Sequence, residues 1–71
     1  MEFSEFCLET RLKLGLSQET LARKLDVSFA TINRWENGKA VPQKLTMYRF
    51  KKFCEDNGIE FTPKLKAVST K

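Results

Sequence analysis

The sequence predicts an all-α fold, a bundle of four to five short helices followed by a short extended C-terminal tail. The chain has 71 residues, which is the size of one small domain. Its apolar residues recur at spacings of three and four in separate segments, the pattern of amphipathic helices. Serines that can cap helices precede these segments and glycines that can end helices follow them.

Composition excludes most kinds of catalytic and metal site. The chain has no histidine, so it has neither an imidazole base nor a histidine metal ligand. Cys7 and Cys54 lie too far apart to form a CxxC pair, and we expect both to be reduced packing residues. A secretory signal and a membrane-spanning apolar run are both missing, which predicts a cytoplasmic protein. We therefore expect no enzymatic activity, cofactor, metal or small-molecule ligand.

Positive charge is concentrated in the second part of the chain. The net charge is +4, with a pI near 9.3. Residues 1–26 hold four basic and five acidic side chains, whereas residues 27–71 hold nine basic and four acidic ones, a net of +5. Such a basic half is typical of proteins that bind polyanions, although a solvated lysine-rich surface has the same composition.

The first helix is predicted over residues 4–14. One face of it would be buried, and consists of Phe3, Phe6, Cys7, Thr10 and Leu14. Gly15 follows at the position where a left-handed residue ends a helix.

Two further helices are predicted across a very tight turn. Ser17 and Ser28 are the N-caps of these helices, which end at Asp26 and near Asn37 before Gly38. Each N-cap is preceded by an apolar residue at hydrophobic-staple spacing from another: Leu16 with Leu21, and Val27 with Ile32. Two short helices joined by so short a turn must cross steeply. Residues 17–37 are therefore predicted to form a helix-turn-helix.

A fourth helix is predicted over residues 43–56, after a loop ending at Pro42. Its inner face would hold Thr46, Met47, Phe50, Phe53 and Cys54. Its outer face would hold Lys44, Lys51, Lys52, Glu55 and Asp56. Residues 59–62 alternate apolar and polar side chains, which favours a short strand. We therefore predict a domain over residues 1–58 and a tail over residues 59–71.

The stretch from Arg11 to Pro42 resembles the phage-repressor and Cro-type helix-turn-helix family, also called XRE-like regulators. The matching residues are Arg11, Gly15-Leu16-Ser17-Gln18, Leu21-Ala22, Val27-Ser28, Ile32, Trp35-Glu36-Asn37-Gly38 and Pro42. They span about half the chain, and the predicted fourth helix also falls where the family has one. The resemblance implies a lambda-repressor-like fold and binding to double-stranded DNA. It also implies a buried ion pair between Arg11 and Glu36.

The third helix, over residues 28–37, is then expected to enter the major groove. Its candidate base contacts are Ser28, Phe29, Ala30, Thr31, Asn33 and Arg34. The guanidinium of Arg34 can pair with guanine, and Asn33 can pair with adenine or contact a phosphate. Phe29 and Ala30 depart from the polar residues common at these positions. They can pack on thymine methyl groups or form a docking patch for another protein.

Phosphate contacts are expected on both sides of this helix. The candidates are Ser17, Gln18, Asn37, Lys39 and Lys44. A helix N-terminus at Ser17 and Gln18 presents unpaired N–H groups and a positive dipole end to a phosphate. A capping serine followed by a solvated glutamine is the structural alternative at that position.

The function that follows is sequence-specific DNA binding by a small transcriptional regulator. A module of this size contacts few base pairs, so a homodimer is expected, at least on DNA. Residues 59–62, with Leu65 and Val68, are the candidate dimer contact. The alternative is a protein-interaction module or antitoxin-like partner that uses Phe29, Ala30 and Val41 as its docking patch.

Overall fold

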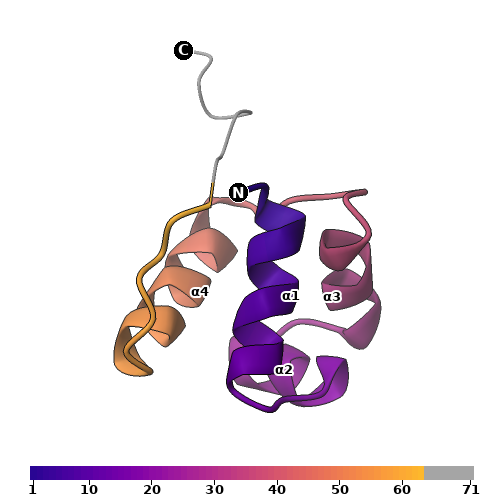
Figure 1. The fold of residues 1–71 in the computed structure, drawn as a ribbon. Coiled ribbons are helices and arrows are strands. Elements are labelled where there is room, and N and C mark those ends of the chain that lie inside the picture. Colours follow the sequence, from indigo (N-terminus) through magenta and orange to yellow (C-terminus); the bar gives the residue numbers. More distant parts are fainter. Residues whose placement is uncertain (64–71) are drawn as a thin grey trace.

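The computed structural model describes residues 1–63 and contains four helices in that range (Figure 1). These are α1 (Phe3–Lys13), α2 (Gln18–Leu25), α3 (Phe29–Glu36) and α4 (Lys44–Asp56). In Figure 1, α1 runs down the middle of the molecule, with α3 and α4 on either side and α2 across its lower end. The all-α prediction is confirmed, and the four predicted helices lie within about one residue of their expected bounds.

Side-chain caps explain where α2 and α3 begin. The Ser17 Oγ accepts a hydrogen bond from the backbone N–H of Thr20 at 3.0 Å, and the Ser28 Oγ accepts one from Thr31 at 3.1 Å. Each cap satisfies one of the unpaired donors at a helix start. Asp26 closes α2 with a φ of 60°, in the left-handed region. This conformation turns the chain at once into α3, which gives the steep crossing of a helix-turn-helix.

The helix α1 starts one residue earlier than predicted. Glu2 is its N-cap, and Glu2 and Glu5 form a reciprocal capping box with each other's backbone N–H groups. At the other end, Gly15 has a φ of 69°, as expected for the residue that ends the helix.

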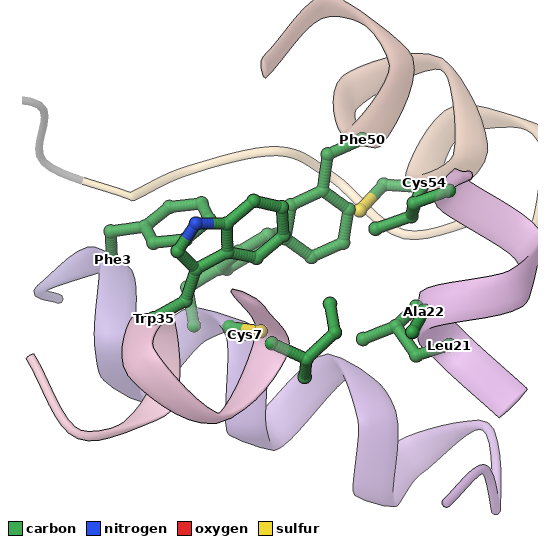
Figure 2. Close-up of a cluster of buried hydrophobic side chains, with 10 residues drawn as sticks. Phe3, Cys7, Leu21, Ala22, Trp35, Phe50 and Cys54 are labelled. Atoms are coloured by element: carbon green, nitrogen blue, oxygen red, sulfur yellow. The ribbon is translucent and has the colours of Figure 1, made fainter. Parts of the chain in front are cut away.

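The core is built on aromatic side chains from α1, α3 and α4. Trp35 stacks on Phe50 with ring centroids 6.1 Å apart, and Phe3 meets both rings edge-on (Figure 2). Cys7 and Cys54 are fully buried free thiols, which confirms that they are packing residues. Leu21, Ala22, Leu25 and Ile32 complete the buried cluster together with Phe6. All four helices therefore share a single core.

The prediction of a short strand over residues 59–62 is wrong. This segment carries no strand in the structure, and its alternation has another cause. Ile59 and Phe61 both turn toward the helices, where the Phe61 ring lies 5.1 Å from that of Phe6 and 5.9 Å from that of Phe50. The segment thus covers the core of its own chain. Leu65 and Val68 lie outside the described residues.

The position of α3 follows from this packing. Its apolar residues Ile32 and Trp35 are buried, and Val27 just before it is half-buried against the same core. The helix packs on both α1 and α2, so its opposite side faces outward. Within residues 1–63, every helix is too short or too polar to cross a lipid bilayer.

Candidate nucleic-acid interface

A nearly buried ion pair joins α1 to the last turn of α3. The Arg11 Nε donates to the Glu36 Oε2 at 2.7 Å, and the Arg11 Nη2 donates to the Glu36 Oε1 at 3.0 Å. The side chains of Arg11 and Glu36 are only 15% and 7% exposed. A third donor, the Arg11 Nη1, binds the carbonyl oxygen of Leu16 at 3.1 Å. The bidentate geometry fixes the end of α3 against α1 and against the loop that precedes α2.

Gln18, the first residue of α2, donates a hydrogen bond to the same carboxylate. Its Nε2 donates to the Glu36 Oε1 at 2.8 Å, and its side chain is half-buried. A primary amide carries two hydrogens on its nitrogen, so one remains for another acceptor. The solvated glutamine that the sequence left open is therefore not the arrangement found. Glu36 holds the start of α2 and the end of α3 together.

This network also keeps Glu36 ionised. Burial alone would raise the pKa of the Glu36 carboxyl, but the hydrogen bonds from Arg11 and Gln18 and the charge of Arg11 lower that pKa below its ordinary value of 4.5. The nearby Cys7 thiol donates weakly to the Glu36 Oε2 at 3.8 Å. Burial, followed by the charge of Glu36, raises the pKa of Cys7 to about 12. The carboxylate is thus charged and the thiol protonated at neutral pH.

Asn33 and Asn37 extend this hydrogen-bond network along α3. The Asn33 Nδ2 donates to the Gln18 Oε1 at 3.4 Å, and the Asn33 Oδ1 accepts from the Asn37 Nδ2 at 3.0 Å. Asn33 is half-buried, whereas Asn37 is exposed. A bidentate pair with adenine requires both the oxygen and the nitrogen of an asparagine amide. Each of these atoms of Asn33 already has one partner within the protein, which orients the amide and leaves one hydrogen and one lone pair for a base or a phosphate.

The outward side of α3 presents two apolar residues and one cation. Phe29 is 53% exposed, and Ala30 and Arg34 are also exposed. Ser28 and Thr31 lie at the same end, but their hydroxyl groups hydrogen-bond each other at 2.9 Å. Within residues 1–63, Arg34 makes no hydrogen bond or ion pair through its side chain. Its guanidinium is therefore available to a partner.

The remaining candidate phosphate contacts are exposed. Ser17 caps α2, Lys39 follows α3, and Lys44 is the first residue of α4. The backbone N–H groups of Gln18 and Glu19 find no acceptor within the described chain. They add partial positive charge at the start of α2, where an anion is stabilised.

A model of a known protein family matches the part of the chain that contains these helices. The family model for the helix-turn-helix matches residues 8–54, which include most of α1, all of α2 and α3, and most of α4. The chain belongs to the helix-turn-helix family. All the candidate DNA contacts and both residues of the ion pair fall inside the matched range.

One curated relative of this helix-turn-helix chain is the HTH-type transcriptional activator BcrR of Enterococcus faecalis. The two sequences are 40% identical over 53 residues, which is 75% of this chain and 26% of the relative. The chain thus spans about a quarter of the length of that relative. No solved structure matches the chain.

The helix-turn-helix domain also exposes apolar residues of α4 that the sequence analysis did not single out. Leu45 and Tyr48 are 62% and 63% exposed, and Val41 in the preceding loop, already a candidate for the docking patch, is 51% exposed. Leu45 and Tyr48 are three residues apart and therefore share one side of α4. A projection of the whole helix, applied to its outer face as well as its inner one, would have found these two. No cluster of three metal-ligating side chains occurs in the described range.

Proposed function

We propose that this domain binds double-stranded DNA sequence-specifically as a small transcriptional regulator, with α3 in the major groove. The observation that carries the proposal is the outward side of α3, where Phe29, Ala30 and Arg34 are exposed while the inward side is fixed in the core. Membership of the helix-turn-helix family and a relative named as a transcriptional activator support it. A rigid helix with an unoccupied outer face is suited to contacting base edges.

In this proposal Arg34 contacts a guanine. A guanidinium can donate two parallel hydrogen bonds to guanine O6 and N7, and within the described chain no other group competes for it. The nearby hydroxyl groups of Ser28 and Thr31 are bonded to each other, and the Asn33 amide keeps one hydrogen and one lone pair for the same site.

The phosphate contacts flank α3 on both sides. Gln18 offers its second amide hydrogen, already oriented by Glu36, together with the free N–H groups at the start of α2. Asn37, Lys39 and Lys44 provide further exposed donors, two of them charged. Ser17 is exposed at the start of α2, where its hydroxyl donates to the Thr20 Oγ1 at 3.0 Å and would have to leave Thr20 to bind a phosphate. Contacts of this kind position a protein on the duplex without distinguishing sequences.

We propose further that two copies bind adjacent half-sites. One domain of this size contacts only a few base pairs, and paired half-sites give the specificity that one lacks. Because Ile59 and Phe61 are used within the chain, the exposed Val41, Leu45 and Tyr48 are the better contact for a second copy. Leu45→Asp should then reduce cooperative binding to paired half-sites while binding to a single half-site is retained.

A protein-interaction module is the second candidate function. The exposed Phe29 and Val41 favour it, because exposed large apolar side chains are typical of protein contacts. In this case the exposed face would bind a partner protein, as in an antitoxin-like role, and duplex DNA would bind weakly.

Titration of the protein with fluorescent duplexes distinguishes the two functions. The DNA-binding proposal predicts affinity for random duplexes that falls steeply with salt, and enrichment of a defined site from a random library. Arg34→Ala should reduce the discrimination between bases at one base pair by about 1–3 kcal/mol. Lys39→Ala should instead lower the affinity for all duplexes by a similar factor. The exposed Lys51→Ala on α4 is the matched control, with little effect expected. Undetectable duplex binding at low salt would refute the proposal.

A further inference from the structure

The candidate base contacts at the start of α3 divide into occupied and unoccupied groups. The hydroxyl groups of Ser28 and Thr31 bond to each other, and the Ser28 oxygen also caps the helix. The amide of Asn33 is shared between Gln18 and Asn37. Every polar side chain among these candidates except Arg34 thus already has at least one partner within the protein. The groups of α3 that have no partner in the described chain are a guanidinium and an apolar surface.

Phe29 is the source of that apolar surface and differs from the other phenylalanines. The chain has six, and the remaining five are buried or half-buried in or against the core. Phe29 alone among them is exposed, at 53%, and Ala30 beside it is exposed as well. As the first residue of α3, Phe29 provides no cap, because Ser28 fills that role. Its side chain therefore has no structural task in the described chain that would explain a large apolar residue there.

We propose that Phe29 and Ala30 recognise the 5-methyl group of a thymine in the major groove. The inference rests on the proposed DNA-binding function and specifies which base edge this site recognises. Thymine is the only base whose major-groove edge presents a methyl group, and apolar side chains distinguish it by contact. An exposed phenyl ring beside hydroxyl groups that bond to each other suits such a methyl better than it suits a hydrogen-bonding edge.

The geometry also limits where this thymine lies. Ala30 and Arg34 are one helical turn apart, about 6 Å along the helix axis at 1.5 Å per residue. Base pairs are spaced about 3.4 Å apart. The thymine methyl should thus fall within about two base pairs of the guanine that Arg34 contacts.

The test removes only the methyl group. A preferred duplex is first selected from a random library with the wild-type chain, and each thymine in it is then replaced in turn by deoxyuridine, which keeps every hydrogen-bonding atom. We expect one or two positions, close to a guanine, at which the replacement weakens binding about fourfold, the effect of one buried methylene. Phe29→Ala should bind the thymine and deoxyuridine duplexes equally.

Two further variants keep the result interpretable. Phe29→Leu retains an apolar side chain and should keep part of the preference for the methyl group. Leu12→Ala removes an apolar residue of α1 that is at least as exposed as Phe29, and it should leave that preference unchanged. Thermal unfolding of each variant checks that the exposed substitutions leave the fold intact.

The outcomes separate this inference from the function on which it rests. A selected site whose affinity is the same with thymine or deoxyuridine at every position overturns the methyl contact alone. A methyl preference that Phe29→Ala leaves intact also overturns it, and assigns Phe29 to a protein partner. If no duplex binds at low salt, the DNA-binding function itself is refuted, and the methyl contact is refuted with it. A methyl effect that disappears only in the Phe29 variants supports the proposal.

Discussion

Replacing Glu36 with glutamine should destabilise the domain more than any surface substitution. The change keeps the size of the side chain but removes the negative charge that Arg11 faces. Arg11 is only 15% exposed, and its Nε and Nη2 both donate to the carboxylate. Loss of one partner of such a buried pair leaves a charge without compensation, which costs about 3–5 kcal/mol.

That loss is comparable with the whole stability of a domain this small. Folded domains are stable by about 0.05–0.15 kcal/mol per residue, or roughly 4–11 kcal/mol for a chain of this length. With a urea dependence of about 1 kcal/mol per molar, Glu36→Gln should lower the unfolding midpoint by about 3 M or more. Fluorescence of Trp35, the single tryptophan and a buried one, follows the transition. Circular dichroism provides an independent probe of the helices.

Two controls test the reasoning. Asp26→Asn removes an exposed pair with Arg49, whose charged atoms lie 3.7 Å apart, and should leave the midpoint almost unchanged. The double variant Arg11→Met with Glu36→Leu removes both charges and should recover most of the lost stability. If Glu36→Gln lost less than about 1 kcal/mol, the ion pair would not be the contact that fixes α3.

The pH dependence of stability provides a second check on the same carboxylate. Because folding lowers the pKa of Glu36, the unfolded chain takes up a proton first as pH falls. The stabilisation is therefore complete above pH 4.5, the ordinary value, and is lost as pH falls from there through the lower pKa of the folded state. Glu36→Gln should flatten the stability profile in this acidic range. An unchanged acid slope would refute the assignment.

Predictions at Gln18, at the two cysteines and at Glu19 also follow from the structure. Gln18→Ala should cost about 1.5 kcal/mol in urea unfolding, by removing a hydrogen bond to a charged group, and should weaken all duplexes about equally in titrations. Burial raises the pKa of Cys7 to about 12 and of Cys54 to about 11, so both thiols should react with a thiol reagent at pH 8 only as fast as the domain unfolds. Their contribution to stability should be complete below pH 9.0 and should fall as pH rises from there to about 11 for Cys54 and about 12 for Cys7. Glu19→Gln, which removes an exposed negative charge from the first turn of α2, should strengthen duplex binding about threefold at low salt.

The helices could be predicted from the sequence because local chemistry decides where they begin and end. Ser17 and Ser28 cap α2 and α3 as expected, and Gly15 adopts the left-handed conformation that ends α1. Periodic apolar residues likewise identified the buried faces of α1 and α4, including Phe50 and Cys54. Each of these features depends on residues within one or two turns of each other.

Features that depend on contacts between distant residues could not be predicted in the same way. Residues 59–62 alternate as a strand does, but the alternation instead places Ile59 and Phe61 on the helical core. Gln18 was expected either to contact a phosphate or to be solvated. Its hydrogen bond to Glu36, 18 residues away, could not be predicted, and its phosphate contact stays a prediction. Only the three-dimensional arrangement shows which side-chain groups are already occupied by another part of the chain.

Side-chain groups that are hydrogen-bonded within the chain connect the stability of this domain with its proposed DNA binding. Glu36 accepts hydrogen bonds from Arg11 of α1 and from Gln18 of α2 while it forms the last turn of α3. The same carboxylate thus fixes both helices that are proposed to contact DNA, and it neutralises a cation that would otherwise attract phosphates. A substitution at Glu36 should therefore impair binding through geometry even where the chain stays folded. At Arg34, which has no partner in the described chain, a substitution should change base preference and leave stability unchanged.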